Sequence, residues 1–394
     1  MNPSASGWIK KLISQLQSKN YYHNLDDESF YNALRHCGFI YGSNIHSLEK
    51  DISTNTLSEE EICKVNLVIA LHYVHTKHNP DQIFVASVIS FYKALNHYKA
   101  SFFEELLGRR KSFGLLESII HKRINIDDNI ITKSFNQFVI NALLFVDILA
   151  FNKYLKNGKI SIDYIKQLEA AIEVIVFKVF EKKTVKTEYD HSLLNLIESS
   201  LRYHNNEQLQ YEDVIAFISS PLEKRYIIDI VCMAAWSDKV IDKEEQEFLH
   251  KLKNDLVLNK DQIIDSVTFV NTFYDINKDH IAHLSSKNLV QNFYDNSSKL
   301  VNKLIKRNSK RLLKELQESK DIMVLLTKST TRKLTDEEQK QVQNQLLDIF
   351  KSIPSLAIFL LPGGMLLLPL FIKFIPKLLP SAFDDNRLDD ELKD

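Results

Sequence analysis

The sequence predicts an all-α protein, a multi-helix bundle that ends in a hydrophobic, proline-interrupted helical segment of the membrane type. Gly and Pro number only 8 each among 394 residues, about 4% together against a usual share near 12%, so few tight turns and hairpins are expected. Apolar residues recur at three- and four-residue spacing along most of the chain, which is the period of amphipathic helices. A long uncharged run near the C-terminal end predicts the membrane-type segment.

Composition and motifs argue against most enzyme classes. The formal net charge is −1, so the protein as a whole has no field that would attract a polyanion. Cys37, Cys63 and Cys232 have no metal-ligand spacing and are interpreted as reduced thiols. No GxGxxG, phosphate-loop, GxSxG or HExxH motif occurs. We therefore expect no enzyme, no catalytic residues and no small-molecule substrate.

Residues 1–210 are predicted to form an N-terminal helical bundle. One face of its first helix carries apolar side chains and is expected to dock on the protein or, alternatively, on a membrane surface: Trp8, Ile9, Leu12, Ile13 and Leu16. Further helices are expected at residues 57–75, 81–98, 133–156 and 161–182, with Gly158 ending one and Ser161 capping the next. The apolar stretch 138–151 is too short for a bilayer and is predicted to be a core helix.

Residues 211–290 are predicted to form a smaller helical module. Ser220, Pro221 and Glu223 have the spacing of a helix start, with Ser as the N-cap and Glu three residues later. The run 234–245, AAWSDKVIDKEE, resembles the TerB-like family, a helical module first associated with tellurite resistance. Lys239 stands where that family usually has Gly.

The TerB-like resemblance implies a divalent-cation site at Asp238, Asp242 and Glu245. Carboxylate oxygens suit a hard cation such as Ca²⁺ or Mg²⁺, the one cofactor that the sequence brings into consideration. The alternative is local, because Asp242 followed three residues later by Glu245 is also a helix-capping box.

Residues 291–345 are predicted to form basic amphipathic helices. Between residues 299 and 314 there are seven basic residues and no acidic one, beside an apolar stripe of Val301, Leu304, Ile305, Leu312 and Leu316. Three roles remain open: binding an anionic membrane surface, binding RNA or the ribosome, or forming the solvated face of a packed helix. The predicted basic surface consists of Lys303, Lys306, Arg307, Lys310 and Arg311.

Residues 346–383 form the hydrophobic segment, and residues 384–394 an acidic tail. Residues 352–372, SIPSLAIFLLPGGMLLLPLFI, are 21 uncharged residues, enough to cross about 30 Å of hydrocarbon as a helix. We expect spanning or re-entrant insertion, and the alternative is a buried hairpin that turns at Pro362, Gly363 and Gly364. The predicted membrane-segment residues are Leu356, Phe359, Leu360, Pro362, Gly363, Gly364, Leu367, Pro369 and Phe371.

Four runs mark residues 321–383: KLTDEE at 333–338, DIFKSIP at 348–354, LP at 361–362 through LLP at 367–369, and KFIPKLLPSAF at 373–383. With these runs, residues 321–383 resemble the Letm family of inner mitochondrial membrane proteins. The resemblance implies a membrane segment and links to cation/proton exchange and ribosome binding. Met365 stands where the family carries a Glu, so the carboxylate expected of an ion carrier is missing. The soluble ribosome-binding domain that follows in the family is expected to be absent.

Together these features predict a non-enzymatic, membrane-associated helical scaffold. The pairing of a TerB-like module with a Letm-like end resembles a bacterial group described as Letm-related biofilm-associated proteins. That resemblance implies a bacterial inner-membrane location on the cytoplasmic side, with membrane lipid and unidentified proteins as partners. The alternatives are a component of a cation/proton transport system that acts with partners, and a soluble ribosome- or RNA-binding module.

Overall fold

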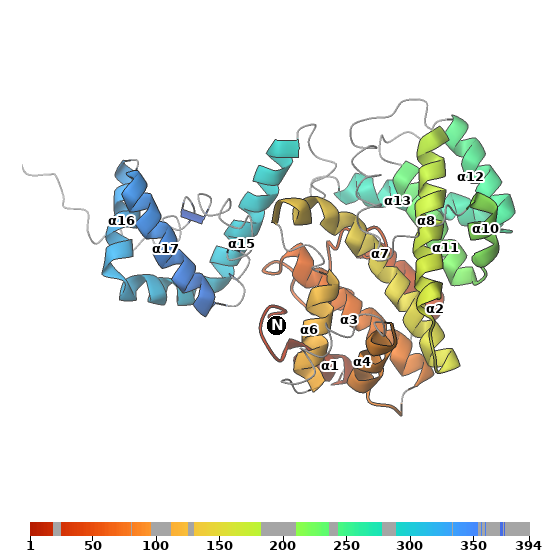
Figure 1. Ribbon diagram of the computed structural model, residues 1–394, viewed down its shortest axis with the longest axis horizontal. Helices are drawn as coiled ribbons and strands as arrows, with labels where there is room; N and C mark the ends of the chain where they lie inside the picture. Colours follow the sequence, from red (N-terminus) through yellow and green to blue (C-terminus); the bar gives the residue numbers. More distant parts are fainter. Residues whose placement is uncertain are drawn as a thin grey trace, which may run out of the picture. The chain divides into compact units, whose positions relative to one another are not determined.

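The computed structural model describes residues 1–18, 25–79, 81–95, 112–124, 130–182, 210–235, 243–277, 289–332 and 334–353, together with 356, 359, 371, 372 and 374. All regular elements in these ranges are helices (Figure 1). The chain divides into two compact units. Unit 1 comprises residues 1–52, 59–126 and 135–285, and unit 2 comprises residues 53–58, 127–134 and 286–394.

The first half of unit 1 contains the helices α1 (Trp8–Ser18), α2 (Asp27–His36), α3 (Glu59–His78), α4 (Phe84–Leu95), α6 (Ser112–Ile124), α7 (Ile130–Asn157) and α8 (Ile162–Lys182). The first turn of α7, residues 130–134, is assigned to unit 2. All five apolar residues predicted for one face of α1 are buried. Glu117 of α6 holds the start of α1, since its carboxylate accepts hydrogen bonds from the backbone N–H groups of Gly7 and Ile9 at 3.1 and 3.2 Å. The first helix therefore docks on the protein.

The end of α7 and the start of α8 follow the capping residues in the sequence. Gly158 lies directly after α7 with φ +69°, a conformation that favours glycine, and its N–H donates to the carbonyl of Tyr154. Ser161 precedes α8 and its hydroxyl accepts from the N–H of Asp163 at 3.2 Å. The described part of the apolar stretch in α7, residues 142–151, is buried throughout, which confirms it as a core helix.

The second half of unit 1 consists of α10 (Tyr211–Phe217), α11 (Pro221–Ala235), α12 (Lys243–Asp255) and α13 (Lys260–Asn277). Glu223 accepts hydrogen bonds from the N–H groups of Ser219 and Ser220, and the hydroxyl of Ser220 accepts from the N–H of Glu223. The predicted capping box is therefore present. α11 packs against both α8 and α13, so residues on either side of the proposed boundary at 210/211 belong to unit 1.

Unit 2 is built on α15 (Leu289–Glu318), α16 (Lys320–Thr331) and α17 (Asp336–Ser352). The apolar stripe predicted on α15 is buried and forms one side of a hydrophobic core with residues of α16 and α17. Thr335 and Glu338 form a capping box at the start of α17, with N–H to side-chain distances of 3.0 and 3.3 Å. The capping box determines where α17 begins, and the apolar stripe determines which face of α15 is turned towards the core.

Candidate functional site

Three phenylalanines join the uncharged residues 352–372, called the apolar run from here on, to the core of unit 2. Phe350 lies on α17, and Phe359 and Phe371 lie within the apolar run. Their ring centroids are separated by 4.5 Å (Phe350–Phe359), 4.7 Å (Phe350–Phe371) and 5.0 Å (Phe359–Phe371), and all three side chains are buried. Such stacked and edge-to-face pairs stabilise a core beyond their buried area.

The closeness of Phe359 and Phe371 corrects one part of the membrane prediction. On a continuous helix, residues 12 positions apart would be separated by about 18 Å along the axis. The two rings are 5.0 Å apart, so Phe359 and Phe371 do not lie on a single helix that spans a bilayer. In the described part of the chain, no helix is long and apolar enough to cross a membrane. Re-entrant insertion and the buried hairpin are the two interpretations that fit this geometry.

The predicted membrane-segment residues are described only in part. Leu356, Phe359 and Phe371 are buried in the core of unit 2. The remaining six, Leu360, Pro362, Gly363, Gly364, Leu367 and Pro369, lie outside the described residues.

The predicted basic surface lies on the outward face of α15. Lys303, Lys306, Lys310 and Arg311 are exposed and Arg307 is half-buried, opposite the buried stripe. Lys303 and Arg307 donate to the carbonyls of Leu57 and Thr56, both at 3.3 Å, in the short segment 53–58 that belongs to the same unit. α15 therefore presents a basic side to its surroundings.

Arg311 connects this basic helix to the start of the apolar run. Its Nη2 donates to the carbonyl of Ser352, the last residue of α17, at 2.5 Å. The hydroxyl of Ser352 donates in turn to Oε1 of Glu315 on α15 at 3.2 Å. A guanidinium at the C-terminal end of a helix also interacts favourably with the helix dipole. The first residue of the apolar run is thus held against the basic helix.

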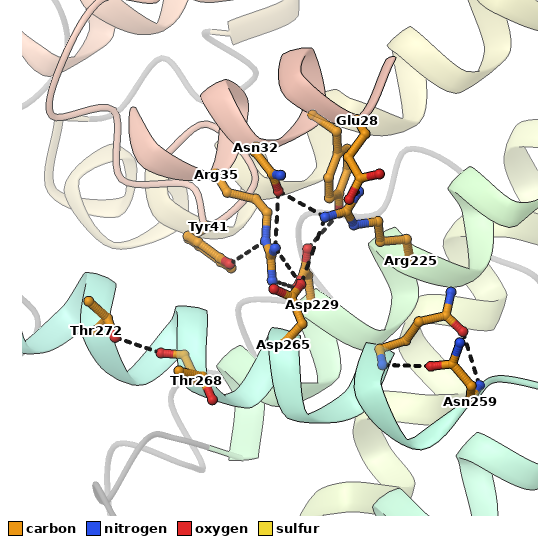
Figure 2. A network of polar contacts seen from close by, with 12 residues as sticks. Glu28, Asn32, Arg35, Tyr41, Arg225, Asp229, Asn259, Asp265, Thr268 and Thr272 are labelled. Carbon is orange, nitrogen blue, oxygen red and sulfur yellow. Dashed lines mark hydrogen bonds and ion pairs between the residues drawn. The ribbon is translucent and has the colours of Figure 1, made fainter. Parts of the chain in front are cut away.

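Unit 1 contains a second candidate site, a network of buried polar and charged side chains (Figure 2). Arg35 of α2 and Asp229 of α11 form an ion pair at 3.0 Å, with both side chains fully excluded from solvent. The hydroxyl of Tyr31 donates to the other oxygen of Asp229 at 2.6 Å, and the guanidinium of Arg35 lies 4.0 Å from the ring centre of Phe269 on α13. Three helices meet at this pair of charges.

Further polar groups surround the guanidinium of Arg35. Its Nε donates to the hydroxyl of Tyr41 at 3.2 Å, and its Nη1 donates to Asn32 at 3.2 Å and to the carboxylate of Asp265 at 2.7 Å. Nη2 of Arg225 also donates to Asn32, at 2.8 Å. The guanidinium thus meets acceptors on several sides, as a buried cation requires.

Burial and the neighbouring charge set the protonation of the network. Burial opposes the charged form of Arg35, but the carboxylate of Asp229 and the hydroxyl of Tyr41 raise the pKa of the guanidinium above its ordinary value. Burial and the Asp229 carboxylate raise the pKa of Tyr31. Burial raises the pKa of Asp229, while Arg35 and the hydrogen bond from Tyr31 act to lower it. The network is a buried polar joint between α2, α11 and α13.

This network is not among the sites that the sequence pattern predicts. The sequence contains one sign of a buried polar site on α11. Asp229 interrupts a stretch of apolar residues, Ile227, Ile228, Ile230 and Val231. An ionisable residue within a buried helical stretch predicts a paired partner, but the pattern does not say which remote residue it is.

The predicted cation site remains a prediction. Glu245 lies at the start of α12 and is fully buried, whereas Asp238 and Asp242 lie outside the described residues. Within the ranges that the structure describes, no group of three or more His, Cys, Asp or Glu side chains is placed to hold a metal ion.

Comparison with known proteins bears on unit 2. A family model described as "LETM1-like, RBD" matches residues 334–393, from the turn before α17 through the apolar run. The C-terminal segment is similar to the LETM1-like family. We call residues 334–393 the LETM1-related segment, and it contains the three-phenylalanine cluster and the carbonyl of Ser352 that Arg311 binds. The description of this family model includes the letters RBD, and the expectation that a separate soluble ribosome-binding domain is absent stays a prediction.

A curated relative matches part of the same chain. The mitochondrial proton/calcium exchanger protein of Drosophila melanogaster is 48% identical over 53 residues, which is 14% of this chain and 5% of the relative. The chain therefore matches only a small fraction of that relative's length. No solved structure shows significant similarity to the chain.

Proposed function

We propose that this protein is a non-enzymatic, membrane-associated helical scaffold, in which the LETM1-related segment provides the membrane contact. The observation that carries the proposal is the 21-residue uncharged run at 352–372, which lies inside the region matched by the LETM1-like family model. Insertion as a re-entrant hairpin is compatible with the proximity of Phe359 and Phe371.

The contacts within each unit support different roles for the two units, partner binding for unit 1 and membrane contact for unit 2. In unit 1 the buried Arg35–Asp229 pair joins α2 to α11, which gives a rigid body suited to holding partners. In unit 2 the start of the apolar run is anchored on α15 by Arg311. We further propose that residues 211–290 act as a TerB-like interaction module and that the protein works at a bacterial inner membrane. Both proposals rest on the sequence motifs that resemble the TerB-like and biofilm-associated groups.

Flotation of the full-length protein with lipid vesicles tests membrane association. The wild-type protein is expected to float with vesicles and to remain bound after a wash in high salt. Leu367→Asp places a charge in the apolar run and is expected to reduce flotation at least ten-fold, because a carboxylate deep in a bilayer costs about 2.5–3.5 kcal/mol.

Val324→Asp is the matched control, since Val324 is an exposed apolar residue of α16 outside the run. It adds the same charge to unit 2 and should leave flotation unchanged. Wild-type protein that stays at the bottom of the gradient with both neutral and anionic vesicles would refute the proposal.

The second candidate is a component of a cation-transport system, which is favoured by the printed name of the 48%-identical relative. Against transport by this chain alone stands the lack of any charged residue between Lys351 and Lys373. Calcium-driven proton flux in liposomes that contain only this protein would favour transport over the scaffold, and flux that needs a co-purified partner would support the assisted form.

A further inference from the structure

We infer that the basic face of α15 binds the headgroups of anionic phospholipids and thereby orients the LETM1-related segment on the membrane. This inference rests on the proposed function and names the lipid class that unit 2 recognises. The basic face is defined here as Lys303, Lys306, Lys310 and Lys314, four exposed side chains on one helix.

The position of the basic face is fixed by the core of unit 2. Val301, Leu304, Ile305, Leu312 and Leu316 are all buried, at most 4% exposed. At about 100° per residue, the four lysines fall on the opposite side of the helix and spread over about 17 Å of its length. Because the stripe cannot turn outward without opening the core, the lysines have to face the surroundings.

Charge and chemistry point to an anionic partner. No acidic residue occurs between residues 299 and 314. On the same helix, Asp295 precedes that range, and Glu315 and Glu318 follow it at the end of the helix. Lys306 and Lys310 are exposed to solvent on the side of α15 opposite the buried stripe. The ammonium group of Lys314 lies 4.0 Å from the carboxylate of Glu318, and both of these side chains are exposed. Ammonium groups act as point charges and do not require a partner of defined shape, which suits a fluid headgroup layer.

The link between α15 and the apolar run favours lipid over nucleic acid. Arg311 binds the carbonyl of Ser352 at 2.5 Å, so the first residue of the 21-residue uncharged run lies next to the basic face. A basic patch beside an apolar insertion supplies the two signals that stable membrane attachment needs, electrostatic and hydrophobic. A nucleic-acid surface would gain nothing from the adjacent apolar run.

The test compares vesicles of phosphatidylcholine alone with vesicles that contain phosphatidylglycerol, using the full-length protein. The triple variant Lys306→Gln/Lys310→Gln/Lys314→Gln removes three charges without touching the core. Each lysine near an anionic surface strengthens partitioning about five-fold, so the variant should lose about 100-fold of its partitioning onto anionic vesicles and little onto neutral ones. The wild-type preference for anionic vesicles should also shrink at 1 M salt, where screening acts within about 3 Å.

The control is Lys10→Gln/Lys93→Gln/Lys260→Gln, three exposed lysines of unit 1 that change the net charge equally. This control should partition like the wild type. If the α15 variant binds anionic vesicles as well as the wild type does, while Leu367→Asp still reduces flotation at least ten-fold, the inference fails and the proposed function stands. If the wild type binds neither vesicle type, both fail.

RNA is the competing partner. Retention of single-stranded RNA by the wild type, lost in the α15 variant, together with equal binding to neutral and anionic vesicles, would assign the face to nucleic acid and overturn the inference. Unchanged or absent RNA retention, with the expected lipid preference, supports it.

Discussion

Arg35 and Asp229 are 194 residues apart in the sequence, yet their side chains form a 3.0 Å ion pair from which water is excluded. This contact ties α2 to α11. The core of unit 1 therefore depends on a polar interaction as well as on apolar packing, and that dependence can be measured.

Asp229→Asn should destabilise unit 1 by about 3–5 kcal/mol, because it leaves the guanidinium of Arg35 buried without its counter-charge. The matched control is Asp265→Asn. The Asp265 carboxylate also binds Arg35, at 2.7 Å, but its side chain is 53% exposed, so its loss should cost under about 1 kcal/mol. Urea denaturation of the full-length variants measures both, and equal losses would contradict a specific role for the buried carboxylate.

Phe359 and Phe371 should show energetic coupling in a double-mutant cycle. With ring centroids 5.0 Å apart and nearly perpendicular planes, Phe359→Leu and Phe371→Leu should be non-additive by about 0.5–1.5 kcal/mol in the stability of unit 2. As a control, Phe359→Leu combined with Phe30→Leu, a ring stacked on Tyr73 in the core of unit 1, should be additive. Additive effects of Phe359→Leu and Phe371→Leu would mean that these two side chains are not in contact.

Val257→Gly should stabilise unit 1 by about 1 kcal/mol. Val257 adopts φ +54° in the turn after α12, a conformation that is costly for a β-branched residue and natural for glycine. Its side chain is 82% exposed, so little packing is lost with it. Ile264→Gly, an exposed position inside α13, is the control and should instead lose about 1 kcal/mol. A rise in melting temperature for Val257→Gly, with a fall for Ile264→Gly, is the expected result.

Acid should destabilise unit 1 in part through His72. Burial, assisted by His75, lowers the pKa of His72 from 6.5 to about 4. As the pH falls, His72 binds a proton in the unfolded chain before it does so in the folded chain. The contribution of neutral His72 to the free energy of unfolding is therefore complete above pH 6.5 and decreases by about 3 kcal/mol as the pH drops towards 4. His72→Phe, beside the ring of Phe84 at 4.9 Å, should flatten this dependence between pH 6.5 and 4. An unchanged slope in urea titrations across that range would exclude His72 as the cause.

Local patterns were sufficient to predict most helices and their ends. The stripe on α1, the stop at Gly158, and the caps at Ser161, Ser220 and Thr335 all depend on residues within a few positions of one another. α3 (Glu59–His78) and α8 (Ile162–Lys182) lie within three residues of the predicted ranges 57–75 and 161–182. The inward face of α15 was predicted for the same reason, since helical period alone determines it.

The sequence by itself determined several helices with their buried faces, and the uncharged, proline-interrupted run with its LETM1-like motifs, because each of these is encoded in neighbouring residues. Tertiary structure alone decided that Arg35 meets Asp229, that Phe371 returns to Phe359, and that Arg311 holds the start of the apolar run. Those contacts join segments between 12 and 194 residues apart. Periodicity tells which side of a helix seeks a partner, but only the folded chain selects which remote segment supplies it.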